Sequence, residues 1–420
     1  MIKYAAPRGM RDFYPEDYRV RDTLFNNWKK TALQHGFEFY DSPIVETLDL
    51  LERKSGEEIS EQIYTFEDKS GRRLALRPEL TPSLARLIIS KQKALNFPIK
   101  WAAIGQCFRY ERMTRGRKRE HYQWNLDIIG EQSVMAEAEV ISTAVDSMRN
   151  LGLQSNDFKV HIGSRAIIGE LFKSCDIDKK YFAACFLVID KKGKIDNEQM
   201  TELMKKEGLQ EKDIVKIFEI LSITSLDQVI KQLGENNWAV KEIQELFAIS
   251  EIMDFRDFLK FDISIIRGLD YYTGIVFEAF DVNKKLRALF GGGRYNSLLS
   301  KLGGEIMPSV GLGFGDVVIL ELLNDLNKAP QSSPSVDYSV GFMDMDSRNF
   351  AISIASSLRA EKFSCDLSLK PEKAKQYFKK ANRIGALNAI LIGQNEASSG
   401  TYKIKNMKTG EVEEKTLDSE

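Results

Sequence analysis

Residues 265–278, IIRGLDYYTGIVFE, place one arginine in a mostly apolar run that also contains two adjacent tyrosines. A buried arginine without a partner is costly, so Arg267 needs an anionic group nearby. In an extended strand Tyr271 and Tyr272 would face opposite sides, one toward the core and one toward a cleft. A pair of core tyrosines is the plainer alternative. From this segment alone we expect only that Arg267 has an anionic partner.

A second segment combines a basic loop with a strand that alternates in polarity. Residues 109–120 contain six arginines and lysines but two glutamates, a local net charge of +4 in a chain of net charge −1. The polar face of the strand that follows consists of His121, Gln123, Asn125 and Asp127. That face could simply meet water. Alternatively, it is the floor of a site beneath arginines that bind phosphate in a bidentate manner. Composition leaves both interpretations open.

Two further segments carry polar residues or glycines where a ligand could approach. Thr81 precedes Pro82, which predicts a helix with Thr81 as its N-cap and Pro82 in its first turn. Glu79 lies just outside that cap and could bind a cationic group. Three glycines precede Arg294, which indicates close approach of the backbone to another group.

The glycines in SVGLGFGD alternate along one face of a predicted strand and leave room for a flat ligand. They are Gly311, Gly313 and Gly315. The dinucleotide-binding fingerprint requires another glycine at the next position, where this chain has Asp316. The sequence therefore argues against a Rossmann site.

Composition describes an ordinary globular protein without a metal or membrane signature. The chain has 420 residues, 43% hydrophobic and 29% charged, and its four cysteines and three histidines lack metal-ligand spacing. The near-neutral net charge provides no general attraction to nucleic acid. No apolar run has the length of a membrane span, and the first residues lack the apolar core of a signal peptide. We expect a cytoplasmic location, no membrane association and no dedicated metal site.

The elements that must position these residues fall into several regions. We expect a first domain over residues 1–325, interrupted by a helix-rich, charged insertion at about 165–260. A linker rich in proline and serine follows at 326–335. Strands and helices then alternate over 336–420, which predicts an α/β module with Ser347 near one helix start and Pro371 in the first turn of another.

Taken together and in this order, the segments resemble the histidyl-tRNA synthetase family of class II aminoacyl-tRNA synthetases. GFEFYDSPIVETLDLL is similar to class II motif 1, FRYERMTRGRKREHYQWNLDIIG to motif 2, and RGLDYYTGIVFE and GGGRYNSL to two signatures of the histidyl enzymes. The resemblance implies an antiparallel catalytic sheet flanked by helices, a helical insertion, and a C-terminal α/β anticodon-binding domain. It also implies a homodimer with Pro43 at the interface.

The resemblance implies activation of L-histidine by ATP, with Mg²⁺ accompanying the nucleotide, and transfer of histidine to tRNA(His). Arg109 and Arg267 match the family's catalytic arginines at the α-phosphate. The residues that match histidine binders are Glu79, Thr81, Gln123, Asp127, Tyr271 and Tyr272. The residues expected at ATP are Arg109, Glu111, Arg117, Arg267 and Arg294.

One position departs from the family pattern. Motif 3 normally supplies an arginine to the γ-phosphate, and Val318 stands at that position here. We expect another cation to replace it, with Arg117 and Arg294 as candidates. This departure also keeps open a non-catalytic, histidine-sensing regulatory paralogue on the same fold. A general RNA-binding protein would fit the basic loop but not the pocket residues.

Overall fold

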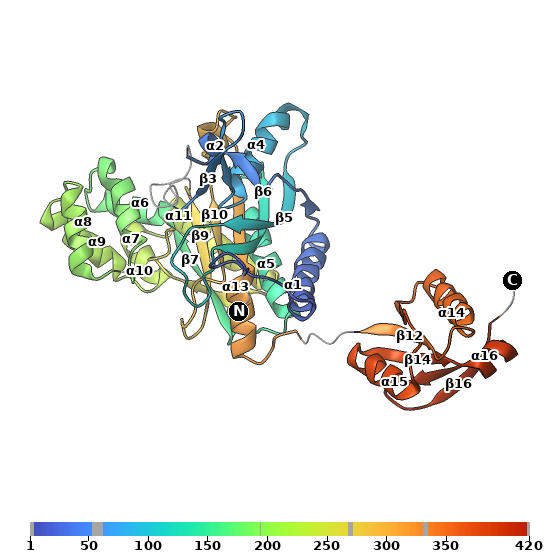
Figure 1. Cartoon of the computed structure of the whole chain (residues 1–420). Coiled ribbons are helices and arrows are strands. Elements are labelled where there is room, and N and C mark those ends of the chain that lie inside the picture. The colour runs from blue at the N-terminus through green and yellow to red at the C-terminus, as the bar shows by residue number, and fades with distance from the viewer. Residues whose placement is uncertain (1–3, 53–61, 194, 268–271, 331–334, 418–420) are drawn as a thin grey trace. The chain divides into compact units, whose positions relative to one another are not determined.

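An eight-stranded sheet carries the residues singled out in the first part of the chain. The computed structural model describes residues 4–52, 62–193, 195–267, 272–330 and 335–417 (Figure 1). The strand order is β1-β5-β6-β11-β10-β9-β7-β8, and all neighbours are antiparallel except β1 with β5 and β7 with β8. The strands are β1 (Glu38–Phe39), β5 (Ile99–Phe108), β6 (Glu120–Ile129), β7 (Phe158–Ser164), β8 (Leu259–Phe261), β9 (Ile275–Asp281), β10 (Phe290–Arg294) and β11 (Ser309–Gly315). The predicted antiparallel sheet is confirmed.

Helices cover the apolar face of this sheet. They are α1 (Pro15–Gln34), α5 (Met135–Asn150) and α13 (Asp316–Asp325). Trp124 of β6 stacks on Trp28 of α1 with ring centroids 5.6 Å apart, and both side chains are fully buried. The alternation in β6 therefore sends its aromatic and aliphatic residues into the core, so its polar residues point to the opposite face.

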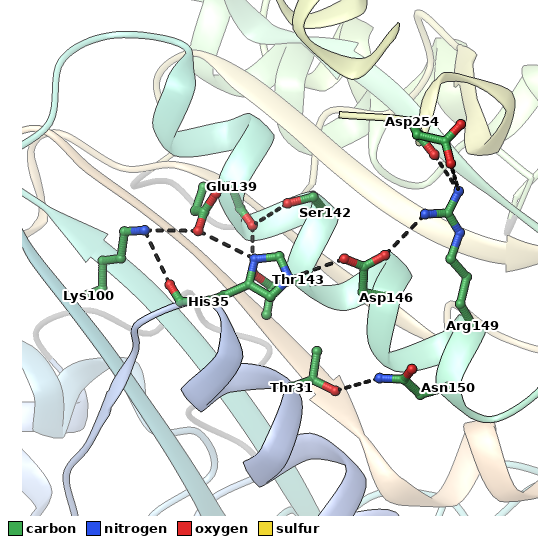
Figure 2. Close-up of polar contacts among 10 residues, drawn as sticks. All are labelled: Thr31, His35, Lys100, Glu139, Ser142, Thr143, Asp146, Arg149, Asn150 and Asp254. Carbon is green, nitrogen blue, oxygen red and sulfur yellow. Dashed lines mark hydrogen bonds and ion pairs between the residues drawn. The ribbon is translucent and has the colours of Figure 1, made fainter. Parts of the chain in front are cut away.

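The end of α1 is attached to α5 by a histidine between two carboxylates (Figure 2). His35 Nε2 lies 3.2 Å from Asp146 Oδ2, and His35 Nδ1 lies 3.4 Å from Glu139 Oε1. Lys100 Nζ of β5 reaches the same Glu139 oxygen at 2.8 Å. Hydrogen bonds and charge from Asp146 and Glu139 raise the pKa of His35 to about 9, so the imidazole is protonated at neutral pH.

A helical region separates β7 from β8. It contains α6 (Arg165–Ser174), α7 (Phe182–Ile189), α8 (Asn197–Lys206), α9 (Glu211–Leu221), α10 (Leu226–Leu233) and α11 (Trp238–Ile252). Figure 1 shows these helices, in green, grouped beside the sheet, and α11 packs on both α5 and α6. The residues expected to be helix-rich are therefore helical in the described part of this region.

Shorter elements complete the pocket side of the sheet. A three-stranded sheet has the order β2-β4-β3, and α4 follows β4 in the chain. The bounds are β2 (Val45–Thr47), α2 (Leu48–Glu52), β3 (Tyr64–Glu67), β4 (Arg73–Leu76), α4 (Thr81–Lys91) and α12 (Leu298–Lys301). The predicted cap of α4 is wrong: Leu80 occupies the cap position, no side chain caps the helix, and Thr81 is already helical. The Thr81 hydroxyl is thus not used as a cap.

The chain divides into two compact units, the first dominated by residues 21–330 and the second by residues 335–417. The second unit is a sheet of order β13-β12-β14-β15-β16 with parallel pairing among its first three strands. Its elements are β12 (Val336–Phe342), α14 (Arg348–Ala360), β13 (Cys365–Leu367), α15 (Ala374–Arg383), β14 (Ala386–Ile392), α16 (Gln394–Ser399), β15 (Thr401–Asn406) and β16 (Val412–Thr416). The α/β alternation is confirmed, although Pro371 precedes α15 instead of lying in its first turn.

Candidate active site

A pocket of about 280 Å³ lies on the polar face of β6, β10 and β11. It brings together nine residues singled out in the sequence, namely Glu79, Thr81, Arg109, Glu111, Arg117, Gln123, Asp127, Arg267 and Tyr272. Tyr271 lies outside the described residues. Segments separated by almost 200 residues thus converge on one cavity.

The polar residues of β6 form the floor of this pocket. His121 Nε2 lies 3.3 Å from Gln123 Oε1, and Gln123 Nε2 donates to Asn125 Oδ1 at 2.7 Å. Burial, with the charge of Arg109, lowers the pKa of His121 to about 3, so this imidazole stays neutral. The structure thus places the polar face of β6 in a pocket, as the second interpretation of this strand predicts.

One end of the floor is built around a buried carboxylate. Asp127 is 1% exposed and its Oδ1 accepts a hydrogen bond of 2.5 Å from the Tyr295 hydroxyl. Gly311 lies opposite Asp127 in the sheet, and a Cβ added at Gly311 would overlap the Asp127 carboxylate. The glycine in β11 is therefore required for this carboxylate to lie over the strand. Sequence reasoning missed Tyr295, whose only signal was its place directly after the glycine run and Arg294.

Glu79 and Thr81 approach the same pocket from the segment that enters α4. Both side chains are buried and line the cavity. Two arginines hold the segment before Glu79 against the end of β5. Arg109 Nε donates to Pro78 O at 2.9 Å, and Arg77 Nε donates to Gln106 O at 2.9 Å. A buried carboxylate and a hydroxyl are thus placed at the rim, where they can bind a cationic group of a ligand.

Two arginines with carboxylate partners also line the pocket. Arg117 Nη2 donates to Glu111 Oε1 at 2.7 Å, and Arg267 Nη1 donates to Glu278 Oε1 at 3.0 Å. The Arg267 guanidinium lies 5.6 Å from the centre of the Tyr272 ring, within cation–π range. A Cβ at Gly291 would overlap this guanidinium, so the glycine leaves space for it. The predicted anionic partner of Arg267 is Glu278 in this structure.

The backbone at Arg267 is held in an unusual conformation by a second arginine. Arg267 has a φ of 53°, in the left-handed region that costs a non-glycine residue about 1 kcal/mol. Arg165, the first residue of α6, donates from Nε to Ile266 O at 2.9 Å and from Nη1 to Tyr272 O at 3.1 Å. Its Nη2 donates to Arg267 O. Arg165 thus holds the backbone at Arg267 and at Tyr272, and no pattern in the sequence indicated this role.

Arg294 does not belong to the pocket. Its side chain is 5% exposed and donates to Glu137 from Nε at 2.7 Å and from Nη2 at 2.5 Å. The carbonyls of Glu131 and Ser133 accept its remaining hydrogen bonds at 3.1 and 2.9 Å. The prediction that Arg294 contacts ATP is not supported by this placement, because Glu137 and two carbonyls occupy the guanidinium.

The segment with Pro43 also lies away from the pocket. Pro43, Ile44 and Val45 are exposed beside β1, an edge strand of the eight-stranded sheet. Arg77 Nη1 donates to Ser42 O at 2.7 Å, which ties this turn to the segment that carries Glu79.

Comparisons with known proteins agree with this geometry. The sequence model described as Histidyl-tRNA synthetase matches residues 9–315. The chain belongs to the histidyl-tRNA synthetase family. The model described as Anticodon binding domain matches residues 338–419 of this family member. These matches confirm the resemblance inferred from the motifs.

Relatives of this histidyl-tRNA synthetase family member match over nearly the whole chain. The histidine--tRNA ligase named chloroplastic/mitochondrial from Arabidopsis thaliana is 44% identical over 98% of this chain and 84% of its own length. The histidine--tRNA ligase of Opitutus terrae is 34% identical over 97% and 95%. The crystal structure of histidyl-tRNA synthetase from Nostoc sp. PCC 7120 has a TM-score of 0.81 at 23% identity, covers 99% of this chain and 97% of its own, and supports the fold.

Among the described residues, no helix is long and apolar enough to cross a membrane. Within the same residues, no three His, Cys, Asp or Glu side chains gather in a way that could hold a metal ion.

Proposed function

We propose that this chain activates L-histidine with ATP to histidyl-adenylate and diphosphate, then transfers histidine to the 3′ end of tRNA(His) and releases AMP. The observation that carries the proposal is the pairing, in one pocket, of a buried carboxylate end with an arginine-lined wall. Asp127 and Tyr295 lie at the carboxylate end, and Arg109 and Arg267 line the wall. An amino acid and a polyphosphate can therefore meet over one sheet.

Histidine binds at the carboxylate end. Asp127 accepts from an imidazole N–H, a hydrogen bond that an isosteric side chain without this group cannot form, and loss of such bonds discriminates strongly. Glu79 and Thr81 receive the α-ammonium group. Gln123 and the tyrosine pair Tyr271–Tyr272 complete the amino-acid pocket, as the family motifs imply.

In the first step, a carboxylate oxygen of histidine attacks the α-phosphorus of ATP. A bond forms between this carboxylate oxygen and the α-phosphorus, and the bond from the α-phosphorus to the departing diphosphate breaks. Arg109 and Arg267 bind the α-phosphate oxygens where negative charge concentrates, which lowers the barrier by electrostatic stabilisation. In the second step, a terminal ribose hydroxyl of the tRNA attacks the histidyl carbonyl carbon, and AMP leaves.

Mg²⁺ that accompanies ATP would be held at this site by the nucleotide and by carboxylates of the pocket. The ion prefers phosphate oxygens, water and one or two carboxylates to a cage made of protein side chains. Glu111 and Glu278 line the pocket and would supply such carboxylates. When Mg²⁺ is bound, it neutralises charge on the phosphates, while the arginines orient the α-phosphate.

The chain forms a homodimer through the segment that contains Pro43. An edge strand of the sheet with exposed Ile44 and Val45 beside it supports this assignment, because such an edge favours pairing with another chain. Ile44→Glu should shift sedimentation velocity toward a monomer, whereas Ile252→Glu, at an 86% exposed position of α11, should not. A wild-type chain that sediments as a monomer would contradict the assignment.

A cytoplasmic location is also part of the proposal. The Arabidopsis relative carries an organellar name, so the location needs a direct test. Fluorescence microscopy of the tagged full-length chain in its own cells should show diffuse cytoplasmic signal; signal confined to an organelle would contradict it.

Histidine-dependent exchange of labelled diphosphate into ATP tests the catalytic proposal. The wild-type protein should exchange only with histidine, and it should then charge tRNA(His). Histidine binding without exchange, in protein shown to be folded, would instead favour the regulatory paralogue. Arg267→Ala is the matched control, because it should bind histidine and fail to exchange.

A further inference from the structure

Strand register provides a scale along the pocket floor. Asp127 pairs with Gly311, whereas Gln123 pairs with Gly315, four residues further along both strands. At about 3.3 Å per residue, these two rows lie roughly 13 Å apart. Strand β10 begins at Phe290, near the Gly315 end. Residues that lead into β10 are therefore far from the carboxylate end, on the side where the outer phosphates of ATP would extend.

Arg287 lies in the segment between β9 and β10 and lines the pocket at this far end. Gly116, Arg117 and Val318 are among the other lining residues. The Arg287 side chain keeps access to solvent, and no described residue forms a hydrogen bond or ion pair with its guanidinium. Partial loss of hydration, together with the charges of Arg117 and Arg109, lowers its pKa. A guanidinium nevertheless stays charged at neutral pH. The positive charges of Arg287, Arg117 and Lys118 therefore outnumber the single negative charge of Glu111 at this end of the pocket.

The other arginines that could serve this end already have carboxylate partners. Arg117 is paired with Glu111, and Arg115 contacts Glu321 at 3.1 Å and also Asp325. Asp316, at the start of α13, is buried against Arg11 at 3.0 Å. One other pocket-lining cation lies at this end. In the described part of the chain, Lys118 forms neither a hydrogen bond nor an ion pair through its ammonium group.

We propose that Arg287 binds the β- and γ-phosphates of ATP and stabilises the diphosphate as it leaves, in place of the arginine that Val318 replaces. The inference rests on the proposed adenylation reaction at this site. A guanidinium fits phosphate oxygens in a bidentate manner, which Lys118 cannot do. The charge of Arg287 becomes most useful as the bond to diphosphate breaks, because negative charge then moves onto the leaving group.

Kinetics of diphosphate exchange in the full-length protein test this role. Arg287→Ala should raise the KM values for ATP and for diphosphate about 10- to 100-fold, since the lost contacts join charged groups. The KM for histidine and the inhibition constant for AMP should stay within about twofold, because neither ligand has a β-phosphate. Arg287→Lys should fall between wild type and Arg287→Ala.

Two lysines provide matched controls. Lys118→Ala removes the other pocket-lining cation at this end and should raise the KM for ATP less than Arg287→Ala does, because an ammonium group cannot bind phosphate in a bidentate manner. Lys285→Ala removes an exposed cation from the same segment and should change the KM for ATP by less than about threefold. The thermal midpoint of Arg287→Ala should equal that of the wild type. Unchanged KM values for ATP and diphosphate in Arg287→Ala would overturn the proposal. An equal rise in the AMP constant, or a larger effect of Lys118→Ala, would do so too.

Failure of the adenylation reaction itself would give a different result. Wild-type protein without exchange activity would contradict the proposed function. Calorimetric titration with ATP and with AMP would then judge Arg287 independently: loss of affinity for ATP alone supports it, and equal affinity of wild type and Arg287→Ala for ATP overturns it.

Discussion

Arg267 and Arg294 are the same residue type in glycine-rich, strand-flanking segments, yet they serve opposite purposes. The Arg267 side chain is 21% exposed, pairs with the carboxylate of Glu278 and lines the pocket, and the Arg267 backbone has a positive φ. The Arg294 side chain is 5% exposed, and Glu137 and two carbonyls surround it. The comparison teaches that enclosure separates the two roles: an arginine enclosed by fixed acceptors holds the fold, and one at a cavity wall can meet a ligand.

The largest effect should come from the enclosed arginine. Arg294→Ala leaves the buried Glu137 carboxylate without its partner, and burial already raises the pKa of that group. Loss of one partner from a buried pair costs about 3–5 kcal/mol of unfolding free energy. Denaturant titration would measure this loss. Arg294→Ala combined with Glu137→Gln should recover part of it. Normal stability with a raised KM for ATP would reverse the assignment of Arg294.

Arg267→Ala should show the opposite pattern. Adenylate formation should fall about 100- to 1,000-fold, the typical effect of removing one group that stabilises transition-state charge. Histidine affinity measured by calorimetry should survive, and the unfolding free energy should change by less than about 1 kcal/mol. Loss of stability comparable to that of Arg294→Ala would erase the distinction between the two regions.

Arg165 lies between these two cases, because it is buried but holds the segment that presents Arg267. Arg165→Lys keeps the positive charge and loses the fork that reaches three carbonyls. We expect kcat of diphosphate exchange to fall about tenfold while the KM for ATP changes little, since orientation is lost and binding is not. Equal changes in kcat and KM would instead indicate direct contact with ATP.

The smallest effect should be the pH-dependent contribution of His35. Its pKa rises from 6.5 unfolded to about 9 folded, so protonation favours the folded state. This stabilisation is full below pH 6.5 and disappears as the pH rises through about 9. His35→Gln should cost about 1 kcal/mol at pH 6 and almost nothing above pH 9.5, after allowance for partial exposure of the pair. Unfolding curves at both pH values measure the difference. A cost that does not change with pH would exclude the ion pairs as its source.

Local pattern predicted much of this molecule. The strict alternation of residues 121–128 separated the core face of β6 from its polar face, because side chains alternate in any strand. That the polar face lines a pocket instead of meeting water was left open by the sequence and came from the structure. The spacing of strands and helices predicted the C-terminal α/β unit. The glycines at 311 and 313 predicted room for a flat ligand, whereas in the structure the side chains of Asp127 and Gln123 take up the space over them.

Long-range partners could not be predicted in the same way. The role of Arg294 depends on Glu137, more than 150 residues away in sequence, and that of Arg165 on carbonyls about 100 residues away. Tyr295 joined the pocket because β10 ends beside Asp127. The predicted Thr81 cap failed because the helix begins at Thr81 itself, which places the hydroxyl at the pocket. Topology decided these outcomes, and no spacing along the chain encodes it.

The glycines under Asp127 and Arg267 also limit which mutations this gene can tolerate. Every missense mutation of a glycine codon introduces a Cβ, and at Gly311 or Gly291 that atom would overlap the carboxylate or the guanidinium. No single base change that replaces either glycine preserves the arrangement. A replacement at either codon must therefore displace one of these two side chains, and in a complete substitution scan both codons should lose activity with every residue other than glycine.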